Sequence, residues 1–322
     1  MTVNRLIVAP GDLGDGLMAV PAVQQFQRKQ GNALTILSKP HVTELWQRAL
    51  GPDRVISYGR GSLATLTTVQ SLRRQNFQEA YVLAESFRSA FLPFLAGIPK
   101  RIGRAGHSRD PFLTKILKEP SGPTIHRTQV YHRILTPGQH LCLNIPIDFP
   151  YLRESEPRHG APSVMGLFPG AGRGSSKIWP IDRYAKVMKN LRREHPESVF
   201  LIFGSNNERR LGQFLARTLP IGVKNLCGQT SLTDLMILLR SCRVVLGNDS
   251  GGVHLASALG VPVVAIFGMT NPDRTRPMGP QTLILQRSKE RSEAIPKKSR
   301  RARAALDLIH PLDVVEAMEQ FL

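Results

Sequence analysis

The first group of residues that could do chemistry is a turn near the N-terminus, "APGDLGDG", which follows the apolar run "RLIV". Asp12 and Asp15 flank Gly14 in this turn, and glycine lets the backbone bend sharply and approach a ligand. A carboxylate at a helix start can face a ligand cleft, or it can simply cap the helix. The glycines at 11, 14 and 16 spell G-x-x-G-x-G and not the G-x-G-x-x-G of dinucleotide-binding proteins, which argues against a nicotinamide site.

A second turn, "LFPGAGRGSSKIWPIDRYA", combines three glycines and two serines with Lys177, just before a helix that Pro180 and Asp182 are predicted to open. Free backbone amides and an ammonium group are suited to holding phosphate. The spacing is not the G-x-x-x-x-G-K-[ST] of P-loop ATPases. A flexible glycine loop with a solvated lysine is the alternative.

A third turn runs from Asn248 to His254 after the apolar run "RVVL". It predicts a helix N-terminus at which exposed amides and a hydroxyl would suit a diphosphate. Capping alone could explain an acidic or hydroxyl residue there, and a single histidine is often a core residue. The polar and glycine residues in question are Asp249, Ser250, Gly251, Gly252 and His254.

No two of the eleven aspartates are two residues apart, and no His, Cys and Asp cluster has the spacing of a zinc site. We therefore expect a site without a metal, in which lysine and helix termini meet the charge of a diphosphate. We expect no cofactor either.

Apolar runs of strand length alternate with helical stretches in both halves of the chain, from "RLIVAP" to "SFRSAFLPFLAG" and again from "SVMGLFPG" to "VPVVAIFG". This pattern predicts an α/β protein with two Rossmann-like, doubly wound parallel sheets in series, residues 1–155 and 156–322. The Pro-, Gly- and charge-rich stretch from about Arg104 to Gly160 is the predicted linker. Such sheets bind ligands beyond the carboxyl ends of their strands, so we expect the site between the domains. The C-terminal helix "HPLDVVEAMEQFL" could pack on either domain.

The chain carries 43 Lys and Arg against 24 Asp and Glu, a net charge of +19 that must attract an anionic partner. The densest basic run, Arg287 to Ala304, has no aromatic side chains for base stacking, and aromatics make up 6% of the chain, so nucleic acid is not favoured. This run is either a solvated loop or a contact with an anionic surface.

The longest apolar runs are too short to cross a bilayer, and the N-terminus lacks a signal-peptide pattern, so we expect the protein in the cytosol. Cys142, Cys227 and Cys242 fit neither a zinc site nor a disulfide framework. All three are predicted to be buried thiols.

Four segments, "GDLGD", "PGAGRGSSKIWP", "GQTSLTDL" and "NDSGGVHLASALGVPVVAIFGMTNP", together resemble the ADP-heptose:lipopolysaccharide heptosyltransferase family, glycosyltransferase family 9. The similarity runs from about Arg5 to about Gly279 and is heptosyltransferase II-like. It implies a GT-B fold, with the acceptor held mainly by the first domain and the nucleotide sugar by the second. It also implies metal-independent, inverting transfer of heptose from ADP-heptose to the inner core of lipopolysaccharide.

Within this resemblance Asp15 is the general base and Lys177 contacts the donor phosphates. Glu208 matches the acid that holds the donor ribose, and adenine would lie near Thr230. The third turn would meet the donor phosphates and sugar through Asp249, Ser250, Gly251, Gly252 and His254.

Arg88, Arg101 and Arg104 are the candidates for binding the phosphates or Kdo carboxylates of the acceptor, although surface solubility explains them nearly as well. Arg88 stands where the family often has lysine, and the basic run replaces a region that is cysteine-bearing in some members. The implied partners are a lipid A-Kdo type acceptor and the anionic cytoplasmic face of the inner membrane, at which the protein would be peripheral.

Three other functions stay open at this point. The nearest is a family 9 glycosyltransferase with another sugar donor or acceptor. A Rossmann-type nicotinamide-dependent oxidoreductase is disfavoured by the glycine order. A nucleic-acid binder would explain the net charge but not the three turns.

Overall fold

The computed structural model describes residues 3–31, 33–106, 108–118, 124–138, 147–150, 163–172, 174–292, 295–296 and 298–322. These residues form two compact units, the first ending at residue 150 and the second beginning at residue 163. The predicted boundary between 155 and 156 lies outside the described residues. The α/β fold class is confirmed, because each unit contains one six-stranded parallel sheet with helices packed on it.

The sheet of the first unit has the strand order β3-β2-β1-β4-β5-β6. Its strands are β1 (Arg5–Val8), β2 (Leu34–Ser38), β3 (Val55–Ser57), β4 (Glu79–Val82), β5 (Lys100–Arg104) and β6 (Lys115–Leu117). Its helices are α1 (Leu13–Gln30), α2 (Pro40–Leu50), α3 (Ser62–Arg74), α4 (Phe87–Leu95) and α5 (Arg127–Leu135), with short 3-10 turns η1 (Pro52–Arg54) and η2 (Asp110–Phe112).

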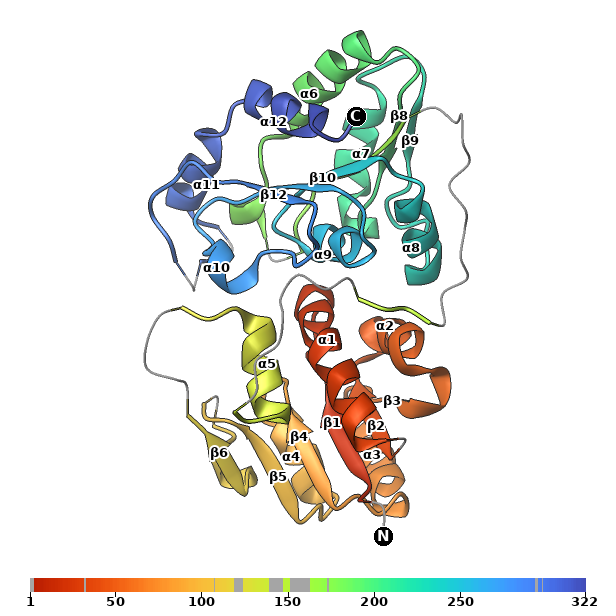
Figure 1. Cartoon of the computed structure of the whole chain (residues 1–322), viewed down its shortest axis with the longest axis vertical. Helices are drawn as coiled ribbons and strands as arrows, with labels where there is room; N and C mark the ends of the chain where they lie inside the picture. Colours follow the sequence, from red (N-terminus) through yellow and green to blue (C-terminus); the bar gives the residue numbers. More distant parts are fainter. Residues whose placement is uncertain are drawn as a thin grey trace. The chain divides into compact units, whose positions relative to one another are not determined.

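In the first unit α1 lies between α5 and α2 and contacts both, as Figure 1 shows, while α3 and α4 contact each other. The central strand β1 is buried from Leu6 to Val8, as expected for a parallel strand covered by helices on both faces. One core cluster joins β1 and β4 to residues of α3 and α4, including Val69, Leu72 and Leu92. The sequence predicted the strands and helices up to α4 from their periodicity.

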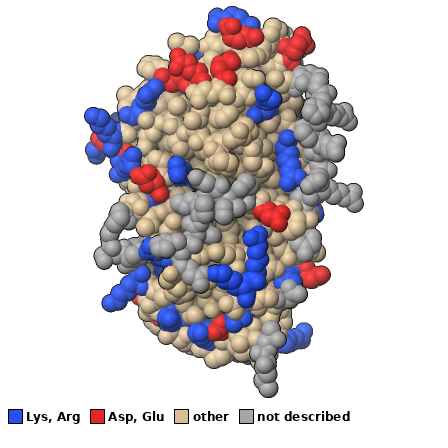
Figure 2. Space-filling view, in the orientation of Figure 1, with Lys and Arg blue, Asp and Glu red and all other residues tan. Residues whose placement is uncertain are grey.

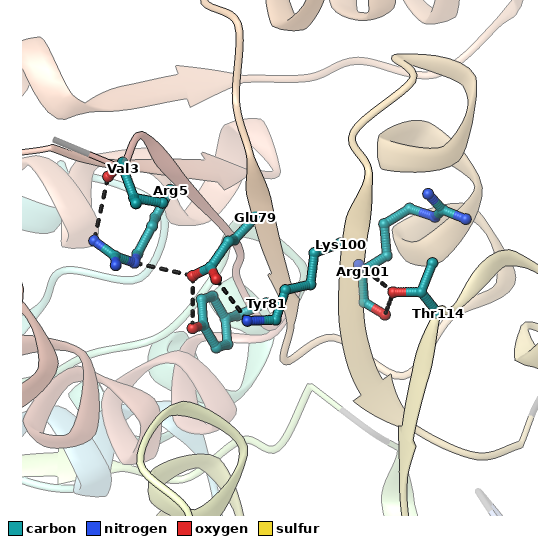
Figure 3. Close-up of polar contacts among 7 residues, drawn as sticks. All are labelled: Val3, Arg5, Glu79, Tyr81, Lys100, Arg101 and Thr114. Atoms are coloured by element: carbon teal, nitrogen blue, oxygen red, sulfur yellow. Dashed lines mark hydrogen bonds and ion pairs between the residues drawn. The ribbon is translucent and has the colours of Figure 1, made fainter. Parts of the chain in front are cut away.

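One row of charged residues crosses three strands of this sheet. The strand register pairs Arg5 with Glu79 and Glu79 with Lys100. Glu79 Oε2 accepts a hydrogen bond from Arg5 Nε at 3.0 Å, and Lys100 Nζ donates to Glu79 Oε1 at 2.6 Å (Figure 3). The Tyr81 hydroxyl donates to the same carboxylate at 3.0 Å. Opposite charges in register support the pairing of β1, β4 and β5.

The sheet of the second unit has the order β12-β11-β10-β7-β8-β9. Its strands are β7 (Val164–Phe168), β8 (Val199–Ile202), β9 (Val223–Asn225), β10 (Val244–Asn248), β11 (Val263–Ile266) and β12 (Thr282–Leu285). Its helices are α6 (Ile181–Glu194), α7 (Arg209–Ala216), α8 (Leu232–Arg240), α9 (Gly251–Ala258), α10 (Pro272–Thr275), α11 (Arg300–Asp307) and α12 (Pro311–Glu319), with 3-10 turns η3 (Ser175–Lys177) and η4 (Asn206–Glu208).

The C-terminal helix α12, for which the sequence left two positions open, packs within the second unit. Val314, Ala317 and Met318 belong to the same core cluster as the strands β7, β8, β10 and β11. The chain end is also tied to β10 through Arg243, whose Nε donates to the Phe321 carbonyl at 2.9 Å. Helix α12 therefore completes the second hydrophobic core.

The predicted linker from about Arg104 to Gly160 was too long. Helix α5 lies inside it and packs on α1, and β6 extends the first sheet. These elements escaped the sequence analysis because β6 has three residues and α5 nine, too few for a clear period among the surrounding prolines and glycines.

The basic run from Arg287 to Ala304 was predicted as a loop, but its last residues form the start of α11 at Arg300. Three of its arginines are paired within the second unit. Arg287 contacts Asp313 at 2.8 Å, Arg291 contacts Asp273 at 2.5 Å, and Arg301 contacts Glu290 at 2.6 Å. Part of the positive charge of this run is thus balanced locally.

Cys227 and Cys242 are buried thiols, as predicted, and Cys142 lies outside the described residues. Burial raises the pKa of Cys227 to about 11 and that of Cys242 to about 12. Within the described parts of the chain, no helix combines the length and the apolar character that crossing a membrane requires.

Candidate active site

Each sheet reverses its strand order at one place, between β1 and β4 in the first unit and between β7 and β10 in the second. Parallel α/β sheets bind ligands beyond the carboxyl ends of the strands at such a switch point. Asp15 follows β1, Lys177 follows β7 and Asp249 follows β10. Each of the three predicted turns therefore lies at the switch point of its own unit, where the topology favours a ligand-binding site.

Lys177 and Asp249 form an ion pair at the switch point of the second sheet. Lys177 Nζ lies 2.5 Å from Asp249 Oδ2, and their side chains are 19% and 8% exposed. Lys177 is the last residue of η3, and Asp249 stands between β10 and α9. The pair brings the second and third predicted turns together, and the Lys177 side chain stays partly exposed.

Asn248, a residue that the sequence analysis did not select, braces the second turn. Its side-chain amide donates to the Pro169 carbonyl at 2.8 Å, and its Oδ1 accepts from the Trp179 backbone amide at 3.1 Å. The fully buried Asn248 side chain thus joins both ends of the glycine loop that carries Lys177. The sequence did offer a signal for this role, because Asn248 ends a buried strand and a buried side-chain amide needs hydrogen-bond partners.

The N-terminus of α9 lies directly after this pair. Ser250 is the residue before the helix and has extended backbone angles, and its buried hydroxyl has no hydrogen-bond partner within the described ranges. The first turn of any helix leaves backbone amides without helical partners. Gly252 packs on the Phe168 ring, where an added Cβ would lie 2.3 Å from a ring carbon. The close approach of α9 to β7 therefore requires glycine at 252.

His254 is buried one turn into α9. Burial lowers its pKa to about 4, although the charge of Asp249 acts in the opposite direction. The imidazole is thus neutral near pH 7, with one ring nitrogen that donates a hydrogen bond and one that accepts.

Glu208 ends η4 and lies against the backbone of the glycine loop. An added Cβ at Gly170 would come within 1.8 Å of Glu208 Oε1, so the carboxylate lies directly over this glycine. Its other oxygen accepts hydrogen bonds from the Ser205 backbone amide at 2.7 Å and the Ser205 hydroxyl at 2.8 Å. Glu208 is therefore held beside the second turn by a capping box.

Thr230 is partly exposed and immediately precedes Ser231, which caps α8 through the Asp234 backbone amide at 3.1 Å. Thr230 lies after β9 at the carboxyl-end edge of the second sheet. The structure places it at the same edge as Glu208, on the neighbouring strand connection.

In the first unit, Asp15 belongs to a chain of charged residues. Arg127 Nη1 lies 3.7 Å from Asp15 Oδ1 and 3.7 Å from Glu85 Oε1. Arg104 Nη1 donates to the same Glu85 oxygen at 3.0 Å. The chain connects Asp15 after β1, Glu85 after β4 and Arg104 at the end of β5 with Arg127, the first residue of α5, so four elements meet at one end of the sheet.

Arg127 and Glu85 were missed by the sequence analysis. Arg127 lies in the stretch that was taken for a linker, and Glu85 follows β4 in "LAES", where a single acidic residue gave little signal. Burial lowers the pKa of Arg127, but Tyr131, Asp15 and Glu85 outweigh it and the pKa is raised. Burial and then the charge of Asp15 raise the pKa of Tyr131, whose hydroxyl stays protonated.

Of the three arginines predicted to bind the acceptor, Arg104 lies in the Asp15 chain and the other two do not. Arg88 Nη2 donates to Thr65 Oγ1 at 2.7 Å, and its guanidinium lies 5.7 Å from the Tyr58 ring centre. Arg101 is at the amino end of β5, where its Nε donates to the Phe112 carbonyl at 2.7 Å. Figure 3 shows its side chain directed away from Glu79. Arg101 thus stands at the opposite end of its strand from Arg104.

Among the described residues, no three His, Cys, Asp or Glu side chains gather closely enough to hold a metal ion. The candidate site of the second unit is built from one lysine, one paired aspartate, one neutral histidine and a helix N-terminus.

Two Rossmann-like units in series, each with charged groups at a switch point, are the architecture of GT-B glycosyltransferases, and comparisons with known proteins assign the chain to that class. The profile of "Glycosyltransferase family 9 (heptosyltransferase)" matches residues 65–304. The chain therefore belongs to glycosyltransferase family 9 and is an enzyme of that family.

Its relatives include lipopolysaccharide heptosyltransferase 2 of Escherichia coli (strain K12), 30% identical with 87% of each chain covered. Lipooligosaccharide heptosyltransferase 2 of Haemophilus influenzae is 27% identical, with 88% of each chain covered. The solved E. coli ADP-heptose lps heptosyltransferase II is 25% identical and has a TM-score of 0.82, with 99% of this chain and 98% of that one covered. The chain is thus similar to heptosyltransferases of type II over nearly its whole length.

Proposed function

We propose that this enzyme transfers heptose from ADP-heptose to the inner core of lipopolysaccharide, with inversion at the anomeric carbon and without a metal ion. The donor is supported by the similarity to the E. coli ADP-heptose lps heptosyltransferase II. The acceptor is supported by relatives named for lipopolysaccharide or lipooligosaccharide. No cofactor is needed, because the donor already has ADP as a leaving group on its anomeric carbon.

The leaving ADP would be stabilised by Lys177 and by the amides at the start of α9. A lysine and a helix N-terminus favour a diphosphate, and they act more strongly where water is partly excluded. Lys177 is paired with Asp249, and a bound diphosphate would share the positive charge of the ammonium group with this carboxylate. Asp249 would then accept hydrogen bonds from sugar hydroxyls, and the Ser250 hydroxyl and neutral His254 supply further polar groups.

The nucleoside would extend along the same edge of the second sheet. Glu208 is held by Ser205 beside the glycine loop, where one carboxylate oxygen can accept from ribose hydroxyls. Adenine would lie near Thr230, on the next strand connection.

Asp15 would act as the general base. Its carboxylate takes the proton from an acceptor hydroxyl while the hydroxyl oxygen bonds to the anomeric carbon and the bond from that carbon to the ADP oxygen breaks. Arg127 lies 3.7 Å away and orients the carboxylate. Arg104, which donates to Glu85 in the same chain of charged residues, would contact phosphate or carboxylate groups of the acceptor, and Arg88 and Arg101 are the other candidates for this role.

The single observation that carries this proposal is the Lys177 and Asp249 ion pair at the N-terminus of α9, at the switch point of the second sheet. The test incubates the purified protein with ADP-heptose and a deacylated inner-core acceptor, in chelator and in magnesium. We expect equal turnover in both and a product whose anomeric configuration, read by NMR, is opposite to that of the donor.

A panel of other nucleotide sugars tests the nearest alternative. Turnover of another donor in place of ADP-heptose would assign the enzyme to a different family 9 reaction. Activity lost in chelator and restored by magnesium, or retention of configuration, would overturn the mechanism.

The acceptor would be a phosphorylated lipid A-Kdo glycolipid at the cytoplasmic face of the inner membrane, with the protein peripheral to it. A net charge of +19 favours an anionic lipid surface. The basic run was the candidate for this contact. Three of its arginines have acidic partners in the second unit, and Lys297 lies outside the described residues.

A further inference from the structure

Net charge does not say which surface would meet a membrane. Figure 2 shows Lys and Arg side chains spread over much of the face in view, with Asp and Glu among them. Charge alone therefore does not define a docking surface, and exposed apolar side chains are the second property that can. The most distinctive group of such side chains is an exposed apolar area on the first unit.

That area is the outer face of α3 and α4, which pack side by side. It carries Leu63 and Leu66 on α3, which are 75% and 60% exposed, and Phe87 and Phe94 on α4, which are 44% and 43% exposed. We call these residues, with Phe91 and Phe112, the α3–α4 face. Large apolar side chains gathered in this way usually mark an interaction surface.

The aromatic part of the α3–α4 face is a built cluster. The Phe112 ring centre lies 5.1 Å from that of Phe87, 5.1 Å from that of Phe91 and 5.2 Å from that of Phe94. Phe87, Phe91 and Phe94 recur at helical spacing on α4, so they form one stripe. The rings of the cluster pack on one another, while Phe87 and Phe94 stay exposed to solvent.

The charges carried by α3 and α4 themselves are of one sign, whereas Glu85 before α4 and Asp110 in η2 are acidic residues at the ends of the face. Neither α3 nor α4 contains an acidic residue, and together they carry Arg73, Arg74 and Arg88. The Arg101 guanidinium lies 5.4 Å from the Phe94 ring centre, which sets a positive charge directly beside the aromatic stripe. Lys115 on β6 is exposed nearby in sequence to Phe112. Apolar side chains rimmed by Lys and Arg match an anionic lipid surface, where rings and leucines enter the interface and cations meet phosphate.

The direction of the helices adds a geometric reason. Helices α3 and α4 begin where β3 and β4 end, at the carboxyl-end edge of the sheet that also carries Asp15. Leu63 and Phe87 lie in the first turns of these helices. A membrane held at the α3–α4 face would thus lie, at Leu63 and Phe87, near the edge at which an acceptor anchored in that membrane has to react, whereas Phe94 and Arg101 lie toward the opposite edge of the sheet.

We infer that the α3–α4 face docks the enzyme on an anionic bilayer, with its leucines and phenylalanines inserted at the interface. This inference rests on the proposed function for the lipid nature of the acceptor. It assigns the contact to the first unit, in place of the basic run of the second.

The experiment measures binding of the full chain to vesicles of phosphatidylethanolamine with phosphatidylglycerol, and to vesicles of phosphatidylcholine alone, by flotation. We expect binding to the anionic vesicles that weakens at high salt. The double variant L63S/L66S should bind at least about tenfold more weakly, because two exposed leucines lose their insertion. Both positions are exposed, so the fold should not suffer, and circular dichroism checks this.

Two matched variants serve as comparisons. F214S/I221S changes side chains of similar exposure, 50% and 74%, in the second unit and should bind like the wild type. L308S/L312S removes exposed leucines beside the basic run, and a loss confined to this variant would assign docking to that region and overturn the inference. The inference would also be overturned if the wild-type protein did not bind anionic vesicles. The same holds if sedimentation showed that L63S/L66S loses vesicle binding because a dimer dissociates into monomers.

Turnover of ADP-heptose on a deacylated, soluble acceptor separates this inference from the proposed function. L63S/L66S should keep that turnover while losing vesicle binding. Vesicle binding that depends on Leu63 and Leu66, in a protein without heptose transfer, would refute the proposed function alone. Heptose transfer with vesicle binding that ignores these leucines would refute the docking surface alone.

Discussion

At the scale of single residues, the Asp15 carboxylate carries the sharpest prediction. Asp15→Asn keeps the size of the side chain but removes the base, so kcat should fall by about 10² to 10⁴. The KM for the donor should change little, because Asp15 belongs to the first unit and the donor groups to the second. Steady-state kinetics with ADP-heptose and a soluble acceptor measures both.

Asp12→Asn is the matched control for this substitution. Asp12 is the residue before α1, and asparagine serves as well as aspartate in that position. Activity within a factor of a few is expected. An Asp15→Asn enzyme that retains a tenth or more of the wild-type kcat would remove Asp15 from the role of base.

His254 carries a prediction on acid stability. Its pKa is about 4 in the folded protein and 6.5 ordinarily, so between these values the unfolded chain binds a proton that the folded chain does not. Stability then falls with falling pH by up to about 1.4 kcal/mol per pH unit. Urea unfolding should show the wild type losing more stability than His254→Gln from pH 6.5 downward. Parallel pH dependences would mean that His254 is accessible to protons in the folded state.

At the scale of elements, Gly252 tests the packing of α9 on β7. Gly252→Ala places a methyl group 2.3 Å from the Phe168 ring, so either the ring or the helix must move. We expect a loss of about 1–3 kcal/mol in the free energy of unfolding and weaker ADP binding. Gly172→Ala is the control, because an added Cβ there has no atom of the described residues within 4 Å. Equal effects of the two substitutions would contradict this account.

The charged row across β1, β4 and β5 makes a second prediction at this scale. Burial by itself raises the pKa of Glu79, but hydrogen bonds from Lys100, Tyr81 and Arg5 outweigh it and lower the pKa below 4.5. A lowered folded-state pKa means that the stabilisation is present above pH 4.5 and is lost as pH falls through the folded-state value. Glu79→Gln should cost about 1–2 kcal/mol at pH 7, and the difference should shrink in acid.

Glu194→Gln is the comparison for Glu79, because its pair with Arg193 is exposed at the surface and contributes little. Urea titrations at several pH values measure both variants. A Glu79→Gln cost that stays constant down to pH 3 would show that the charge of Glu79 is not what stabilises the three strands.

At the scale of the whole molecule, the proposed donor-binding residues all belong to the second unit, which predicts that ADP stabilises this unit. ADP at about 100 times its Kd should stabilise the unit that binds it by about 2.7 kcal/mol. Hydrogen exchange should then slow most in the second unit, up to about a hundredfold in β7, β10 and α9. Protection centred on α1 and α5 would place the nucleotide in the first unit and contradict the assignment of Lys177.

The sequence predicted the strands and helices with clear periodicity, and it identified the three turns that precede α1, α6 and α9. It missed β5, β6, α5 and β12, whose runs are short or interrupted by charged residues such as Lys100, Arg101 and Lys115. A charged residue in a strand is tolerated where a partner crosses from the next strand, as Glu79 does for Lys100. Such partners are invisible until the register is known.

The sequence by itself determined where the strands end and which glycine, acidic and basic residues follow them. Apolar periodicity and turn-forming residues are local properties, so they can be identified from neighbouring residues alone. The tertiary structure decided which of these residues meet. Lys177 and Asp249 are 72 positions apart and touch because β7 and β10 are neighbours at the switch point. Arg127 reaches Asp15 because α5 packs on α1, and the exposure of Phe87 and Leu63 depends on what α3 and α4 leave uncovered. Contacts of this kind arise from strand order and helix packing, which no local pattern encodes.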